Sequence, residues 1–180
     1  FAAASKLTGS PQPLVESITM RLAETQALTG NHTEAAAAYS TFLEKFPASR
    51  WTRNARFGFA FATEQAGEPT AALPEYAKLL DGSKLDLWTV RSSFQSGSCY
   101  AKLKQTDQAV IAFVKVEISY PQYPKWQAQS ILEIGRILLT QKKPEQAAER
   151  FKDVIQRFDK EEAAAEARKL LAGAAPTPSN

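Results

Sequence analysis

The chain has 180 residues, of which 44% are hydrophobic and 23% charged, and its formal net charge is +3. This composition is typical of a soluble globular protein, and the charge is too small and too evenly spread to predict a nucleic-acid partner. No apolar run approaches the ~20 residues that a membrane helix needs, and a single cysteine excludes an intramolecular disulfide. Alanine is abundant and β-branched residues are sparse, which favours an all-α fold.

The first helix is expected to follow a short irregular segment. Residues 1–13 contain Gly, Ser and two prolines, and they indicate either the tail of a preceding element or a loose leader. From Leu14 onward, apolar residues recur at helical spacing until Gly30 ends the run.

The second helix carries start and stop signals. Asn31 followed by Glu34 predicts a capping box. Proline disfavours helical geometry in the residue before it, so Phe46 and Pro47 mark the helix end. These two helices form a first expected repeat over residues 14–47.

The second expected repeat, residues 50–84, is irregular. Pro69 suits the first position of its second helix, but Pro74 lies in the helix interior and predicts a kink or a late start. Lys84 stands where the first repeat has its terminal proline.

The third and fourth expected repeats cover residues 85–121 and 124–159. Thr106 is expected to cap the second helix of the third repeat, and Pro144 to open that of the fourth. A last helix over residues 160–173 starts acidic and ends basic, so we expect it to cap the array. Residues 174–180 are expected to form a flexible tail.

The four expected repeats share one spacing of landmarks. A small residue is followed twelve residues later by alanine, and the alanine four residues later by an aromatic ring. The small residues are Ala23, Ala60, Gly97 and Gly135; the alanines are Ala35, Ala72, Ala109 and Ala147; the rings are Tyr39, Tyr76, Phe113 and Phe151. We expect these residues to form the core, with each ring filling the space toward the following repeat.

This pattern resembles the tetratricopeptide repeat (TPR), which keeps the same landmarks and ends in a proline that Pro47 and Pro121 supply. The resemblance covers residues 14–158. It implies a single superhelical domain over residues 14–173, a right-handed α-solenoid of four helix pairs and a capping helix.

The repeats are longer than the ~34 residues of a standard TPR. Successive rings lie 37 or 38 residues apart, and the extra residues fall at the repeat junctions. Junctions such as FPASRWTRNARFGFA are similar to those of bacterial envelope TPR proteins, including the Tol-Pal coordinator and outer-membrane assembly lipoproteins. The resemblance therefore implies a periplasmic or cell-envelope location, with a cytoplasmic one left open.

The sequence offers little for catalysis. His32 is the only histidine and Cys99 the only cysteine, and neither has partners at ligand spacing. We therefore expect that the protein is not an enzyme and that it binds no metal, cofactor or small-molecule substrate. Arg50, Arg53 and Arg56 recur every three residues and could contact phosphates, but a solvated helix face is the favoured interpretation.

The resemblance implies that the first helices of the repeats line a concave groove that binds a protein or peptide segment. The residues that it places in the groove are Asn54, Phe57, Phe61, Arg91, Phe94, Ser98, Leu132 and Arg136. We expect the aromatic rings to anchor the partner and the arginines to orient it. Two alternatives stay open: Phe57 and Phe94 could pack between neighbouring helices, and the array could serve self-association or space the domains of a larger protein.

Overall fold

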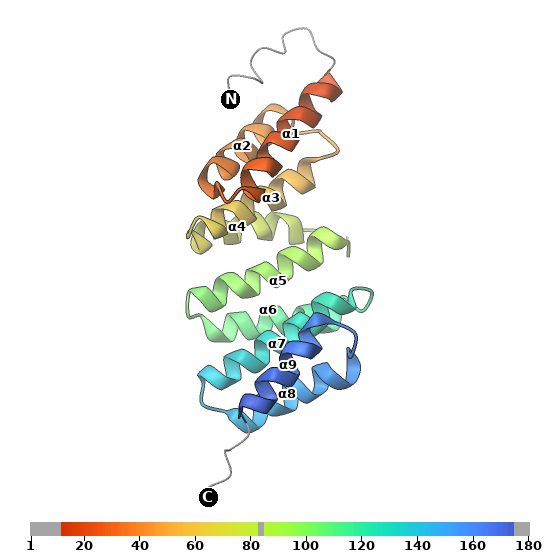
Figure 1. Ribbon diagram of the computed structural model, residues 1–180. Helices are drawn as coiled ribbons and strands as arrows, with labels where there is room; N and C mark the ends of the chain where they lie inside the picture. Colours follow the sequence, from red (N-terminus) through yellow and green to blue (C-terminus); the bar gives the residue numbers. More distant parts are fainter. Residues whose placement is uncertain (1–11, 83–84, 175–180) are drawn as a thin grey trace, which may run out of the picture. The chain divides into compact units, whose positions relative to one another are not determined.

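A computed structural model of the protein describes residues 12–82 and 85–174, and within these ranges it contains nine α-helices and no strand (Figure 1). The helices are α1 (Gln12–Leu28), α2 (His32–Lys45), α3 (Thr52–Gln65), α4 (Pro69–Leu80), α5 (Leu87–Lys102), α6 (Thr106–Ser119), α7 (Pro124–Thr140), α8 (Pro144–Arg157) and α9 (Glu162–Ala174). The expected all-α class is confirmed, as are the four helix pairs and the final helix. None of the described helices is long and apolar enough to cross a bilayer.

The chain divides into two compact units, the first with α1–α4 and the second with α5–α9. The division lies between residues 84 and 85, where the sequence places the junction of the second and third repeats. Within each unit, every helix packs on the next one along the chain, as in a TPR solenoid. The right-handed superhelix expected for the whole array stays a prediction.

The core of the first unit is built from small residues and rings on α1, α2 and α3. Ala23, Ala35 and Phe42 have no exposed surface, and Tyr39 is buried with them. A Cβ atom on Gly58 would overlap the Tyr39 ring, so this glycine lets α3 approach the ring of the preceding pair. Burial, together with the nearby Glu24, raises the pKa of Tyr39 to about 12, which keeps the phenol neutral.

In the second unit, glycines in mid-helix meet the ring of their own helix pair rather than that of the preceding pair. A Cβ on Gly97 would lie 2.7 Å from the Phe113 ring, and a Cβ on Gly135 would overlap the Phe151 ring. Phe113 also packs with Ile134 of the following pair, as expected for the aromatic position. Each of these two rings thus lies between a glycine of its own repeat and the next helix. The sequence pattern alone did not indicate the contact between ring and glycine.

The expected capping box at Asn31 is wrong. Helix α2 begins after Asn31 as expected, but the Asn31 side chain makes no capping hydrogen bond. Its amide group donates instead to Gln26 Oε1 at 3.1 Å and to Thr29 Oγ1 at 3.2 Å. The backbone of Asn31 lies outside the extended region that an N-cap usually adopts, so its side chain turns toward the end of α1.

Two further expectations at helix starts are corrected. Thr106 is the first residue of α6 rather than its cap, because the turn from Lys104, which has a φ of 60°, places Gln105 in the capping position. Helix α4 shows no late start and runs from Pro69 through Pro74. Pro74 is exposed, so water can satisfy the carbonyl that its missing N–H leaves free.

Most helix ends lie within two residues of the positions that the sequence predicts. Helix α1 begins at Gln12 rather than Leu14, and α9 reaches Ala174, one residue beyond the expected end. The remainder of the expected leader and of the expected tail lies outside the described residues.

Candidate functional site

In the second unit, α5, α7 and α9 enclose a surface cavity of about 200 Å³. Its lining residues are Phe94 from α5, Gln129, Leu132, Glu133 and Arg136 from α7, and Glu162, Ala163 and Glu166 from α9. The α7 residues recur every three or four positions and therefore share one helix face. The cavity brings together three of the residues expected in the groove: Phe94, Leu132 and Arg136.

The floor of this cavity is apolar. The Phe94 ring is half-buried and packs at 5.3 Å from the Phe113 ring and 5.2 Å from the Trp126 ring, measured between centroids. Leu132 is only 5% exposed and belongs to the core cluster that includes Ala163 of α9. Phe94 therefore offers apolar surface at the cavity, whereas Leu132 mainly supports α9.

The rim of the cavity is acidic. Arg136 donates hydrogen bonds to Glu133 at 2.6 Å and to Glu166 at 2.7 Å, and Glu162 lies on the same side of α9 as Glu166. The cavity lining thus contains three carboxylates and one guanidinium group, which pairs with two of them. Arg136 is therefore already paired within the chain, with Glu133 and Glu166, and its expected role in orienting a partner stays a prediction.

Burial raises the pKa of Glu133 above its ordinary value, and Glu166 adds to this effect, while Arg136 acts in the opposite direction. The folded state therefore holds this proton more tightly than the unfolded chain, so this contribution to stability is present at low pH and is lost as pH rises through the raised pKa. We expect Glu133→Gln to remove this loss, so that the variant gains stability relative to wild type as pH rises above the ordinary pKa of glutamate. Urea unfolding of both proteins at several pH values measures the difference, and a difference independent of pH would contradict the assignment.

The other groove residues of the second unit lie outside the cavity lining. The Arg91 guanidinium stacks over the Trp88 ring at 5.3 Å, both on α5, and Ser98 is partly buried on the same helix.

The three groove residues of the first unit lie on α3. Phe57 is only 4% exposed, and its ring stacks on Phe61 at 6.0 Å and packs against Tyr76 at 5.8 Å. Phe57 therefore packs inside its own helix pair and has little surface to offer a partner. Phe61 and Asn54 are partly exposed.

The arginines that could contact phosphates already have partners on α3 and α4 or beside them. Arg50 stacks over Trp51 at 4.9 Å, and Arg56 binds Glu75 at 3.0 Å. Cys99 is fully buried, and among the described residues no group of His, Cys, Asp and Glu could hold a metal ion.

The acidic rim of the cavity was not predicted from the sequence. The acidic start of the last helix indicates only a favourable interaction with the helix dipole, and the repeat pattern does not place Glu133 or Glu166 in the groove. The spacing of Glu162 and Glu166 places both on one helix face, but that pattern does not say which helix the face meets. Contact of α9 with α7 as well as α8 supplies that information.

Two family models described as tetratricopeptide repeat match the chain, one at residues 20–49 and 91–123 and the other at residues 132–175. Together they cover more than half of the chain. The chain belongs to the tetratricopeptide repeat family.

Solved structures agree with this fold. A tetratricopeptide repeat protein from Parabacteroides merdae matches with a TM-score of 0.68 at 15% identity over 88% of this chain, which spans 59% of that protein. Pseudomonas aeruginosa pilF matches with a TM-score of 0.65 at 20% identity, covering 92% of this chain and 78% of the other. A thermophilic TPR protein of Thermus thermophilus matches with a TM-score of 0.63 at 18% identity, covering 88% and 80%. No curated protein matches the sequence.

These findings define the class of protein. TPR repeats are generally non-catalytic scaffolds for protein–protein interactions, and the matches indicate no enzyme family. At these identities the structural similarity establishes the fold and leaves the partner to be identified from the site itself.

Proposed function

We propose that the chain is a scaffold that binds a protein segment at the cavity between α5, α7 and α9, and that this segment carries a basic residue beside an apolar side chain. The observation that carries this proposal is the acidic rim around Phe94. Helices α5 and α7 are first helices of their pairs, which the TPR resemblance assigns to the concave face.

The charge of the rim supports a basic partner. Glu133 and Glu166 share the single cation Arg136, and Glu162 completes an excess of negative charge. The Glu166 side chain is 51% exposed, so a lysine or arginine of the partner can reach it. Complementary charge at an exposed rim acts mainly on association rate and specificity.

The size of the cavity supports a single apolar anchor. Small-molecule sites usually have volumes of ~300 to 1,000 Å³, and this cavity has about 200 Å³. One side chain of the partner can enter it and contact the Phe94 ring, while the backbone continues over the surface. Anchoring by one apolar side chain within a polar rim is a common arrangement at protein interfaces.

A charge reversal tests the proposal. We expect peptides selected on the wild-type chain from a random library to be enriched in Lys or Arg next to a large apolar residue. Their affinity should fall at least about tenfold in the variant Glu162→Lys/Glu166→Lys, and should weaken with added salt. Fluorescence anisotropy with labelled selected peptides measures both effects.

A matched control is available on α8. The variant Glu145→Lys/Glu149→Lys makes the same change of charge at the same spacing, and Glu145, like Glu162, lies in the first turn of its helix. We expect this variant to keep peptide affinity within about twofold, since neither residue lines the cavity and exposed charges are screened by salt. Equal losses in the two variants, or selected peptides without basic residues, would contradict the proposal.

Self-association is the alternative function, and two exposed isoleucines on α6 favour it. Ile111 and Ile118 are 68% and 72% exposed, so α6 presents two large apolar side chains to solvent. Light scattering at several concentrations distinguishes the two functions: a monomer that binds peptide supports the scaffold, and a dimer that Ile111→Glu/Ile118→Glu dissociates supports self-association.

We also propose a bacterial cell-envelope location. The long repeat junctions support it through the resemblance described above. Fractionation of cells that express the full open reading frame provides the test, and recovery of the protein in the cytoplasm alone would exclude this location.

A further inference from the structure

Helix α6 carries a continuous stripe of exposed side chains. The stripe consists of Asp107, Ile111, Lys115 and Ile118, which follow one another at intervals of four, four and three residues. Residues at these intervals share one face of a helix. The α6 stripe therefore presents apolar and charged side chains in alternation on a single surface of the second unit.

The helices that correspond to α6 in the first and fourth repeats lack this stripe. Helices α2 and α8 have the same length as α6, and shifts of 74 and 38 residues align their boundaries with it. The residues that align with the two isoleucines are small or polar: Ala37 and Glu44 in α2, and Glu149 and Gln156 in α8. Large apolar side chains at these outward positions are therefore a property of α6 and are not required by the repeat.

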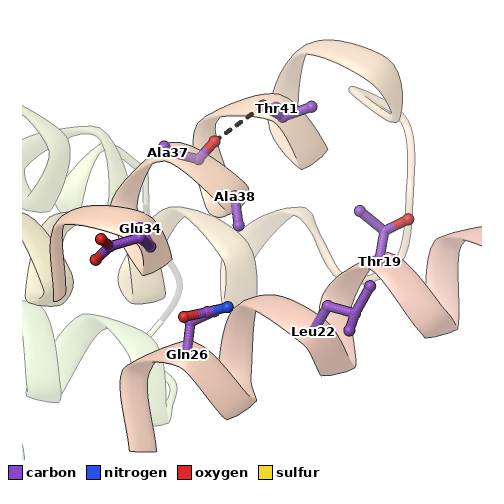
Figure 2. Close-up of a pocket in the computed structure, with 7 residues that line it drawn as sticks. All are labelled: Thr19, Leu22, Gln26, Glu34, Ala37, Ala38 and Thr41. Atoms are coloured by element: carbon purple, nitrogen blue, oxygen red, sulfur yellow. Dashed lines mark hydrogen bonds between the residues drawn. The ribbon is translucent and has the colours of Figure 1, made fainter. Parts of the chain in front are cut away.

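Figure 2 shows the corresponding part of α2, at the edge of a pocket between α1 and α2. Ala37 occupies the position of Ile111. Thr41 occupies the position of Lys115, and its hydroxyl donates a hydrogen bond to the Ala37 carbonyl at 2.9 Å. These two positions of α2 thus offer a partner neither a large apolar side chain nor a charge.

The charged residues of the α6 stripe are available to another chain. Neither Asp107 nor Lys115 forms an ion pair within residues 12–82 and 85–174. Glu117, also on α6, is by contrast bound to Arg157 of α8 at 2.9 Å. Opposite charges without a partner in the described part of the chain therefore lie on either side of Ile111.

We infer that two copies of the chain pair through the α6 stripe, with the two α6 helices antiparallel and a two-fold axis at Ile111. Asp107 lies four residues before Ile111, and Lys115 lies four residues after it. An antiparallel pairing centred on Ile111 places Asp107 of each copy opposite Lys115 of the other and the two Ile111 side chains against each other. The stripe is thus complementary to itself, whereas a parallel pairing in register would oppose like charges.

A groove beside the stripe accommodates the other isoleucine. It has a volume of about 640 Å³ between α6, α7 and α8, with Ile134 and Leu138 of α7 among its lining residues and Asp107 on its α6 wall. Ile118 of the second copy lies seven residues beyond the axis, about 10 Å toward the N-terminal end of α6, where this groove lies. Removing the Ile118 side chain from water there stabilises the pair.

The α6 stripe lies apart from the cavity in which we place peptide binding. Ile134 and Leu138 of α7 line the groove beside the stripe. Leu132 and Arg136, which line the cavity, are each two positions away from them, so they point to a different side of α7. The inference gives a geometry to the self-association considered above and rests on it, so it and peptide binding can fail separately.

Charge reversal tests the pairing of Asp107 with Lys115. Asp107→Lys and Lys115→Asp each replace two attractive contacts in the dimer by two repulsive ones. We expect each variant alone to dimerise at least about tenfold more weakly than wild type. An equimolar mixture of the two variants should dimerise about as strongly as wild type, because both contacts of the mixed dimer again join opposite charges. Sedimentation velocity over a concentration series measures all four samples.

Recovery in the mixture separates this pairing from damage to the fold, which mixing cannot repair. Glu34→Lys is a further control, since Glu34 lies in the first turn of α2 as Asp107 does in α6, and it should leave dimerisation within about twofold of wild type. A wild-type chain that is monomeric at every concentration would overturn the inference. A mixture that dimerises no more strongly than either variant alone would overturn it as well.

Cysteine cross-linking locates the two-fold axis. A residue on the axis meets its own copy, so Ile111→Cys is expected to form a disulfide between two chains under mild oxidation. The new cysteines of Ile118→Cys would lie about 21 Å apart along the paired helices and should not cross-link. Cys99 is fully buried and serves as the background in the wild-type chain. The reverse result, or no cross-link in either variant, would contradict an axis at Ile111.

Discussion

Replacing Phe151 with alanine is expected to lower the free energy of unfolding of the second unit by about 3 to 5 kcal/mol. The Phe151 ring is 1% exposed and belongs to a cluster with Ala147, Val154 and three alanines of α9. Its removal leaves a cavity between α7, α8 and α9 that small neighbours cannot fill. Denaturant unfolding followed by circular dichroism measures the loss.

The controls separate ring packing from general sensitivity to mutation. Ile118→Ala removes an exposed apolar side chain from α6, and we expect a change within about 0.5 kcal/mol. Phe151→Leu keeps most of the buried volume and should cost clearly less than Phe151→Ala. A loss below about 1 kcal/mol for Phe151→Ala would show that this ring is not a core element.

Gly135→Ala is expected to destabilise the second unit by about 1 to 3 kcal/mol, although alanine favours helices over glycine by about 1 kcal/mol. The added Cβ would overlap the Phe151 ring, which the surrounding core holds in place. The sign of the change is therefore opposite to the one that helix propensity predicts. Thermal and urea unfolding of the variant determine this sign.

Gly173→Ala is the matched control, because a Cβ at Gly173 in α9 meets nothing within 4 Å. We expect this variant to be neutral or slightly more stable. The double variant Gly135→Ala/Phe151→Leu should lose less stability than the sum of the two single variants, since a smaller side chain makes room for the Cβ. Additive losses would mean that Gly135 and Phe151 do not meet.

The fold could be predicted from the sequence because its signals are local. Glycines and prolines at positions such as Gly30 and Pro144 mark helix ends through their own backbone preferences. Small residues and rings at fixed spacing, as in Gly97 and Phe113, then define the helix pairs. The hydrogen bonds of the Asn31 side chain were harder to predict, because a short polar side chain has several partners within reach. Asn31 donates to Gln26 and Thr29, which precede it, and not to the backbone of α2.

The site could be predicted only in part. Phe94, Leu132 and Arg136, which the TPR resemblance places in the groove, line one cavity, and binding of a partner there stays a proposal. The burial of Phe57 depends on Tyr76 of the next helix, and the neutralisation of Arg136 depends on Glu166 of α9. The burial of Phe57 and the pairing of Arg136 both depend on contacts between helices. The spacing of residues along one helix does not indicate such contacts.

The most direct test uses a peptide selected from the random library, with a basic residue next to a large apolar one. Changes in the NMR chemical shifts of the chain on adding this peptide locate its binding site. The account predicts that the largest shifts occur at Phe94 and Glu162 and at the residues around Glu166. It also predicts small shifts on α8. Shifts concentrated on α6 and α8, with those around Phe94 unchanged, would contradict the assignment of partner binding to the cavity between α5, α7 and α9.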